Sequence, residues 1–172
     1  NKFELIAYLT KNKNDSLTKR IQFFFSSWNV LHKMDDQAAA KKIYDKNINV
    51  LIDLSGHTAN NCLSIFAWKP APIQISWLGY FATTGLIEMD YIIGDPYVTP
   101  FGQDNYYTEK VWRMPKTRWC FTEPKDKIKV STLPALRNGY ITFGSFNNVS
   151  KINNEVIELW SKVLSSITDS KL

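Results

Sequence analysis

A buried parallel strand is predicted by Ile48-Asn49-Val50-Leu51-Ile52-Asp53-Leu54, which runs directly into the polar segment Ser55-Gly56-His57-Thr58. Short apolar runs of this kind are typical of parallel sheets that are covered on both faces. The pattern recurs at Ile73-Gln74-Ile75-Ser76-Trp77, which opens into a loop rich in Gly and Thr. Because ligands dock beyond the carboxyl ends of parallel strands, the two loops together predict one cleft.

Strand-like and helix-like segments alternate through much of the chain. Asp15 or Ser16 can cap a helix that ends near Ser27, and Asp35 and Asp36 open a second helix. The strands are expected at 3–9, 28–31, 48–54, 73–77, 90–95 and 110–114, and the helices at 15–27, 35–44 and 60–68. This alternation predicts an α/β fold with one doubly wound parallel sheet and right-handed crossovers.

The last part of the chain indicates a second domain. Residues 121–138 are rich in Lys, Thr and Pro and are typical of a linker. Beyond them, 140–145 predicts a strand and 153–166 an amphipathic helix, which together cannot enclose a core. Since the chain also begins without Met, it is expected to be a piece of a longer protein.

Composition narrows the function class. The chain has 172 residues, of which 44% are hydrophobic and 22% charged, and a net charge of +5. The densest basic cluster, residues 125–129, is short, which favours a solvated loop over a nucleic-acid site. No membrane span or signal region is indicated, so a cytoplasmic location is expected. Cys62 and Cys120 lack CxxC spacing, which indicates neither zinc nor a disulfide, and both are expected to be free thiols in the core.

Several side chains are candidates for chemistry. His57 suits acid–base work or a hydrogen bond to a sugar, although local loop hydrogen bonds would also explain it. The segment Thr83-Thr84-Gly85 either cradles a phosphate or sugar hydroxyls or forms a plain turn. The segment 144–151 either meets an anionic diphosphate or exposes a lysine near a helix start. The acidic residues at strand ends, which either cap loops or act as acids and bases, are Asp53, Asp90 and Asp95.

Familiar catalytic signatures are absent from the sequence. It contains no GxGxxG, no GK[ST] loop, no GxSxG and no HExxH. The motifs of dinucleotide, P-loop, serine-hydrolase and zincin chemistry are therefore missing. A sugar-nucleotide enzyme built from two facing domains needs none of them.

The chain resembles the catalytic region of the protein O-GlcNAc transferase and SPINDLY-like glycosyltransferase family. The Gly56-His57-Thr58 form is similar to the SPINDLY-like and bacterial branch, whereas Phe81 stands where the family usually has Pro. The matching segments are 3–9, 53–58, 69–74, 77–80, 83–85, 89–91, 107–110, 119–120, 139–148 and Lys151.

The resemblance implies two Rossmann-like lobes of the GT-B type. Residues 1–120 would be the N-terminal lobe, 121–138 the linker, and 139–172 the beginning of the nucleotide-sugar-binding C-terminal lobe. It also implies inverting transfer of a sugar, GlcNAc from UDP-GlcNAc or fucose from GDP-fucose, to Ser or Thr of an acceptor protein. Neither a metal nor a cofactor is implied, and tetratricopeptide repeats usually precede the lobes.

The resemblance also assigns roles to single residues. Lys151 would contact the donor diphosphate, with Asn148 nearby. The resemblance would place His57 and Thr83-Thr84-Gly85 on the acceptor side of the cleft. Together with the acid–base chemistry open to a histidine, this makes His57 the expected catalytic residue, and the expected substrate-binding residues are Thr58, Thr83, Thr84 and Gly85. The 172 residues alone are expected not to transfer sugar. A non-catalytic lobe that binds other proteins is the alternative.

Overall fold

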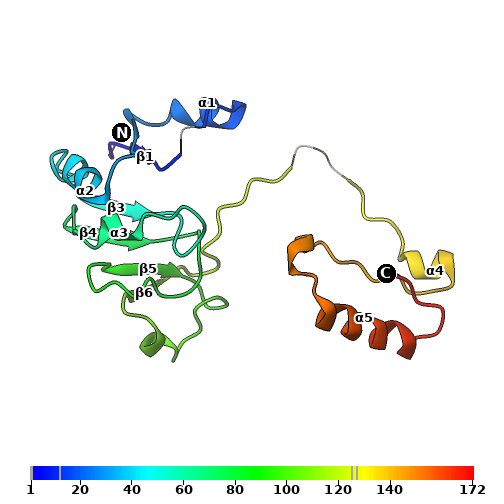
Figure 1. The fold of residues 1–172 in the computed structure, drawn as a ribbon. Coiled ribbons are helices and arrows are strands. Elements are labelled where there is room, and N and C mark those ends of the chain that lie inside the picture. The colour runs from blue at the N-terminus through cyan, green and yellow to red at the C-terminus, as the bar shows by residue number, and fades with distance from the viewer. Residues whose placement is uncertain (1, 12, 125, 127) are drawn as a thin grey trace. The chain divides into compact units, whose positions relative to one another are not determined.

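A computed structural model describes residues 2–11, 13–124, 126 and 128–172 of the chain (Figure 1). Contacts between Cα atoms divide it into two compact units, Asn1–Phe121 and Thr122–Leu172.

The first unit is an α/β structure with two parallel sheets. One sheet pairs β1 with β2, and the other has the order β3-β4-β5-β6. Its elements are β1 (Ile6–Leu9), α1 (Ser16–Gln22), β2 (Ser27–Val30), α2 (Asp36–Tyr44), β3 (Val50–Asp53), α3 (Leu63–Phe66), β4 (Ile73–Ser76), β5 (Tyr91–Gly94), the 3-10 helix η1 (Asp104–Tyr106) and β6 (Lys110–Arg113).

The parallel pairing confirms the predicted fold class, but the prediction of one doubly wound sheet is wrong. Within the described residues β1 pairs only with β2, and the strands of the larger sheet follow one another in chain order. A doubly wound sheet instead has a point at which its strand order reverses. The strict alternation of strands and helices also ends at β4, because the connection from β4 to β5 is a loop over residues 77–90 without a helix. That loop carries the candidate site residues Thr83, Thr84 and Gly85.

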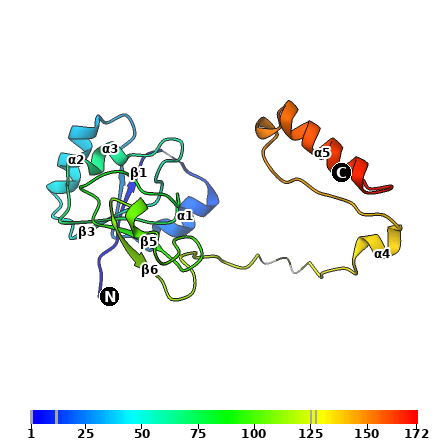
Figure 2. The same cartoon turned by 90° about the horizontal axis from the view of Figure 1, so that it is seen from below.

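Aspartates begin the first two helices, as their sequence positions predict. The Asp15 side chain accepts the backbone N–H of Thr18 at 2.7 Å, and the Asp35 side chain accepts that of Ala38 at 2.8 Å. Each bond satisfies an amide that has no partner inside its helix. Helices α2 and α3 lie side by side (Figure 1, Figure 2). Together with β3 they supply most of the core, which consists of Leu31, Ala39, Ala40, Ile43, Leu51, Leu63, Ile65, Phe66, Ala71 and Met89.

A polar cluster fixes β4 in the sheet. Gln74 is fully buried, and its side-chain amide donates to the carbonyls of Phe66 at 2.9 Å and Glu88 at 3.0 Å. Lys69 donates to the same Glu88 carbonyl at 2.7 Å and forms an ion pair with Asp90 at 2.6 Å. The segment 69–74 therefore ties the end of α3 and the start of β4 to the turn before β5.

The second unit contains α4 (Pro134–Asn138), the 3-10 helix η2 (Val149–Lys151) and α5 (Asn154–Ser166). The helix predicted over 153–166 is confirmed as α5, and the Asn153 side chain caps it by accepting the Val156 N–H at 2.9 Å. The strand expected over 140–145 is not formed. Strand structure needs a paired backbone, and among the described residues Thr142 makes only one isolated bridge, with Lys171.

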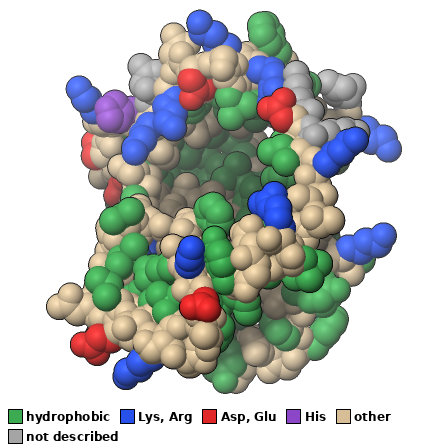
Figure 3. Space-filling view, turned by 90° about the vertical axis from the view of Figure 1, so that its right-hand side faces the viewer, with side chains coloured by type: hydrophobic (Ala, Val, Ile, Leu, Met, Phe, Trp, Pro, Cys, Tyr) green, Lys and Arg blue, Asp and Glu red, His purple; other side chains and the backbone are tan. Residues whose placement is uncertain are grey.

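Large hydrophobic side chains are exposed on both units, and green patches lie among basic side chains in Figure 3. Examples are Phe101, Trp112, Ile157 and Leu159. Among the described residues no helix is both long enough and apolar enough to cross a membrane.

The cysteines agree only in part with expectation. Cys62 and Cys120 are both free thiols, as predicted. Cys62 is half-buried, and burial raises its pKa. Cys120 is exposed, which corrects its expected place in the core, because it follows the last strand of the sheet rather than lying inside it.

Candidate functional site

The loops that follow β3 and β4 are packed together through two glycines. Gly56 has a φ of +53°, and a Cβ atom added there would lie 2.5 Å from Cβ of Tyr80. A Cβ atom on Gly79 would lie 2.3 Å from the carbonyl oxygen of Leu54. Because neither position accepts a side chain, the two backbones approach more closely than other residues would permit. The adjacent loops predicted from the sequence are thus in direct contact.

Asp53 shapes the first of these loops. Its side chain is buried and accepts the N–H of Ser55 at 3.0 Å and that of Gly56 at 2.8 Å. Of the two roles considered for this aspartate, the structure supports the loop cap. The turn that it closes carries His57 out of the sheet.

His57 is exposed at the end of this turn and reaches across to the other loop. Its Nε2 atom lies 3.1 Å from the carbonyl oxygen of Thr83. The imidazole also lies edge-to-face with the Tyr80 ring, at 5.7 Å between centroids. Tyr80 in turn stacks on Phe81 at 5.0 Å. The structure therefore brings His57 and the threonine loop together, as predicted.

Glu109 holds the threonine loop from below the surface. This buried carboxylate accepts the Thr83 hydroxyl at 2.8 Å and the Thr84 backbone N–H at 2.6 Å. It also accepts the hydroxyl of Thr84, which is itself buried. The N–H of Gly85 donates to the Thr83 hydroxyl at 3.0 Å. The loop is thus held by a charged acceptor with several donors, a strong form of hydrogen bonding.

Arg118 anchors the Trp77–Tyr80 loop. Its guanidinium is buried and donates to the carbonyls of Tyr80 at 3.0 Å and Leu78 at 3.3 Å. Leu78 has a φ of +69°, which is rare for residues other than glycine. Burial lowers the pKa of Arg118, while the nearby Asp95 carboxylate acts to raise it. The arginine therefore stabilises a strained backbone that places Tyr80 beside His57.

Asp95 organises the end of β5. It is buried and accepts backbone N–H groups from Arg118 at 2.8 Å, Val98 at 2.8 Å and Tyr97 at 2.9 Å. These bonds, that from Arg118 foremost, hold the pKa of the carboxyl below its usual range. Because all three of these donors are backbone N–H groups, the structure supports the loop cap, the first of the two roles considered for Asp95.

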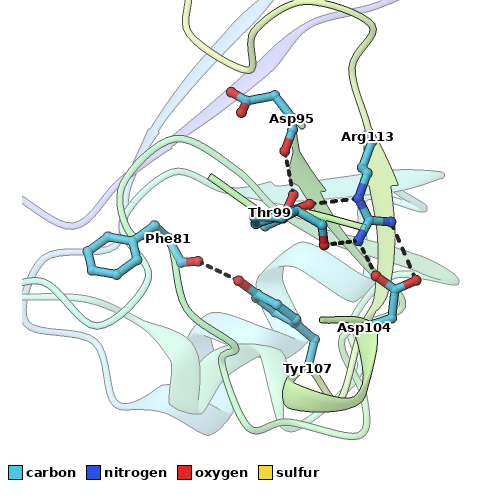
Figure 4. A network of polar contacts seen from close by, with 7 residues as sticks. Phe81, Asp95, Thr99, Asp104, Tyr107 and Arg113 are labelled. Carbon is cyan, nitrogen blue, oxygen red and sulfur yellow. Dashed lines mark hydrogen bonds and ion pairs between the residues drawn. The ribbon is translucent and has the colours of Figure 1, made fainter. Parts of the chain in front are cut away.

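A further network supports this edge of the sheet (Figure 4). Arg113 donates through Nε to the Thr99 carbonyl at 2.7 Å and forms an ion pair with Asp104. Thr99 donates its hydroxyl to the Asp95 carbonyl at 3.0 Å. Separately, the Tyr107 hydroxyl donates to the Phe81 carbonyl at 3.2 Å. The segment 95–107 is thereby tied both to β6 and to the loop that carries Phe81.

The other predicted site residues lie as follows. Thr58 is exposed, with its hydroxyl donated to the Ser55 carbonyl at 2.9 Å. Asn148 lies in the second unit, where its side chain accepts the Ser150 N–H at 3.1 Å and begins η2. Lys151 is exposed at the end of the same turn. Asn148 and Lys151 are thus presented together, and their roles stay predictions.

Glu109 and Arg118 organise the site although the sequence did not indicate either of them as a site residue. Glu109 stands inside a matched segment, 107–110, which was the available signal. Arg118 lies just before the matched pair 119–120 and is part of no motif that would have indicated a role in the site. Within the described part of the chain, His, Cys, Asp and Glu side chains nowhere gather in threes as a metal site would require.

Comparison with known proteins places these loops in a family. The model of glycosyl transferase family 41 matches residues 1–123, which include every loop described above except those of the second unit. The chain belongs to glycosyl transferase family 41. The resemblance inferred from the motifs is confirmed.

Relatives extend the match across most of this family 41 chain. It is 37% identical over 174 aligned positions to a probable UDP-N-acetylglucosamine–peptide N-acetylglucosaminyltransferase SPINDLY of Eustoma exaltatum subsp. russellianum, covering 99% of this chain and 19% of that protein. It is 47% identical over 79 positions to the UDP-N-acetylglucosamine–peptide N-acetylglucosaminyltransferase of Caenorhabditis elegans, covering 46% of this chain and 7% of that protein.

The fold of this chain also matches a solved structure. A mutant of the Thermobaculum terrenum O-GlcNAc transferase aligns with a TM-score of 0.82 and 32% identity, covering 97% of this chain and 31% of that chain. The family 41 chain spans about a fifth of the length of the plant relatives, 19% in the Eustoma protein.

Proposed function

We propose that this chain is part of the catalytic region of an inverting glycosyltransferase that moves GlcNAc from UDP-GlcNAc to Ser or Thr hydroxyls of proteins. The relatives are named UDP-N-acetylglucosamine–peptide N-acetylglucosaminyltransferases, which supports the donor and the acceptor class. The lobes would be of the GT-B type, with the first unit as most of the N-terminal lobe and the second as the start of the C-terminal lobe.

One observation carries the catalytic part of the proposal. An exposed imidazole, His57, stands at the carboxyl end of a parallel strand and is held by the Thr83 carbonyl. Ligands of α/β folds bind at this edge, and histidine is the usual general base near neutral pH. His57 would orient the acceptor hydroxyl and accept its proton as the oxygen attacks the anomeric carbon.

The leaving diphosphate needs positive charge, and Lys151 is proposed to supply it. A fixed cation that meets the negative charge of the leaving group lowers the barrier more than it strengthens ground-state binding. Asn148, which begins the same 3-10 turn, would help to place the donor. Thr58, Thr83 and Gly85 would lie on the acceptor side. Because the hydroxyl and amide of Thr84 are already donated to Glu109, we propose that Thr84 supports the loop rather than touching substrate.

The test uses the complete protein that carries this chain. It is incubated with an acceptor protein and, in parallel, with labelled UDP-GlcNAc or GDP-fucose. We expect label only from UDP-GlcNAc, and on Ser or Thr. Transfer from GDP-fucose instead would overturn the assignment of the donor, and no transfer from either would favour a non-catalytic lobe that binds other proteins.

Lys151→Ala tests the role of the lysine, with the exposed Lys162→Ala as the matched control. We expect Lys151→Ala to lower kcat about a hundredfold or more and Lys162→Ala to leave it within about twofold. Equal activities of the two variants would contradict the role of Lys151. The 172 residues on their own are proposed to be inactive, and detectable transfer by them would contradict that.

A further inference from the structure

We propose that Glu109 is a positioning residue that, through Thr83, fixes the His57 imidazole in the tautomer protonated at Nε2 and so makes Nδ1 the atom that accepts the proton. The inference rests on the proposed function, in which His57 is the base. It concerns a buried side chain that does not itself reach substrate.

The tautomer follows from the partner of the imidazole. Nε2 of His57 lies 3.1 Å from the main-chain carbonyl oxygen of Thr83. A carbonyl oxygen has no hydrogen to give, so Nε2 must be the donor in this bond. In the neutral ring only one nitrogen carries a proton, which leaves Nδ1 with the free lone pair.

The bond can select a tautomer only if the carbonyl is fixed, and Glu109 fixes it. One carboxylate oxygen accepts the Thr83 hydroxyl at 2.8 Å, while the other accepts the Thr84 N–H at 2.6 Å and the Thr84 hydroxyl. The carbonyl of Thr83 belongs to the peptide group whose N–H is that of Thr84. Glu109 therefore binds the same peptide group that His57 binds, from its other side.

Burial makes this arrangement specific to a charged acceptor. Glu109 is 3% exposed, and a carboxylate removed from water must be satisfied by donors. The Thr108 N–H also donates to the Thr83 hydroxyl, at 3.2 Å, so the residue preceding Glu109 holds the same threonine. A neutral amide in place of Glu109 would turn an N–H₂ group toward at least one of the donors of Thr83 and Thr84.

The consequence for the reaction concerns one proton. As the acceptor oxygen forms its bond to the anomeric carbon, the hydroxyl proton passes to Nδ1, and the bond between sugar and diphosphate breaks with its electron pair on the diphosphate. An imidazole protonated at Nδ1 instead would point an N–H at the hydroxyl and could not accept this proton. Loss of the hydrogen bonds from Thr83 and Thr84 to Glu109 would therefore lower kcat more than it changes KM.

The tautomer is measured directly by NMR on the complete protein labelled with nitrogen-15 histidine, at about pH 8.5, where an ordinary imidazole is neutral. His57→Gln identifies the signals of His57 by their loss. We expect the wild type to show Nε2 as the protonated nitrogen and Nδ1 as the unprotonated one. Glu109→Gln is expected to show a mixture of both tautomers, with the exposed Glu123→Gln as the unchanged control.

Thr83→Val is the second variant, since it keeps the main-chain carbonyl but removes the hydroxyl that Glu109 accepts. It is expected to shift the tautomer in the same direction, measured without substrate. A wild-type ring protonated at Nδ1, or a tautomer unchanged in both variants while each remains folded, would overturn the inference.

Kinetics separates this inference from the proposed function. We expect Glu109→Gln to lower kcat about tenfold to a hundredfold with KM for the donor within about twofold. If His57→Ala lowers kcat but Glu109→Gln does not, the positioning role of Glu109 is wrong and the proposed function stands. If His57→Ala leaves kcat unchanged, His57 is not the base and this inference fails with it, while the sugar transfer itself is judged by the donor experiment above.

Discussion

Gly56 and Tyr80 occupy a space that leaves no room for a side chain on the glycine. A Cβ atom on Gly56 would lie 2.5 Å from Cβ of Tyr80, and the backbone there has a φ of +53°. This contact sets the distance between the loop that carries His57 and the loop that follows β4.

Gly56→Ala is therefore expected to destabilise the protein by about 2–4 kcal/mol, since a steric clash adds to the strain of a positive φ. Gly102 is the matched control, because its φ is +86° but an added Cβ atom meets nothing within 4 Å. Gly102→Ala should cost about 1–2 kcal/mol. Urea unfolding measures the free energy of unfolding of both variants. Equal losses would show that the contact with Tyr80 adds nothing to the cost of a side chain at Gly56.

Arg118→Met should loosen the loop that carries Tyr80. Removing the guanidinium leaves the carbonyls of Leu78 and Tyr80 without their donors, at a cost of about 2–4 kcal/mol. Arg20→Met, at an exposed arginine of the same unit, should stay within about 0.5 kcal/mol of the wild type. Thermal unfolding measures the difference, and similar melting temperatures of the two variants would contradict the anchoring role of Arg118.

Asp95 should make stability depend on pH in the acid range. The N–H groups of Arg118 and Val98 lower its pKa in the folded state. A lowered folded pKa contributes stability that is fully present above the pKa of an unfolded aspartate, about 3.9, and is lost as the pH falls through the folded value.

The stability of Asp95→Asn should thus fall furthest below that of the wild type at neutral pH, and the difference should narrow below about pH 4. Urea unfolding between about pH 7 and pH 3 measures this. Parallel curves for the two proteins at all pH values would show that the carboxylate is not responsible.

The sequence predicted those parts of the fold that depend on local patterns. The caps Asp15, Asp35 and Asn153 and the strands β3 and β4 follow from residue type and spacing, and the structure forms all of them. Strand pairing depends on distant partners, which explains the two misjudged features. Two sheets form instead of one, and residues 140–145 make a single bridge rather than a strand.

The candidate site, too, was predictable only where it depends on local sequence patterns. The loop with His57 and the loop with Thr83 were predictable as neighbours, because parallel strands end at one edge of a sheet. The buried Glu109 and Arg118 were not, since nothing local distinguishes an exposed Glu or Arg from one that donates or accepts inside the protein. Their partners, Thr84 and Tyr80, lie 25 and 38 positions away in the chain.

The proposed role of His57 as the base is tested by sugar transfer in a His57 variant. His57→Ala in the complete protein is compared with His32→Ala, the other histidine of this chain and also exposed, using labelled UDP-GlcNAc and an acceptor protein. We expect His57→Ala to lower kcat about a hundredfold or more and His32→Ala to leave it within about twofold. Unchanged kcat in a folded His57→Ala protein would contradict that role.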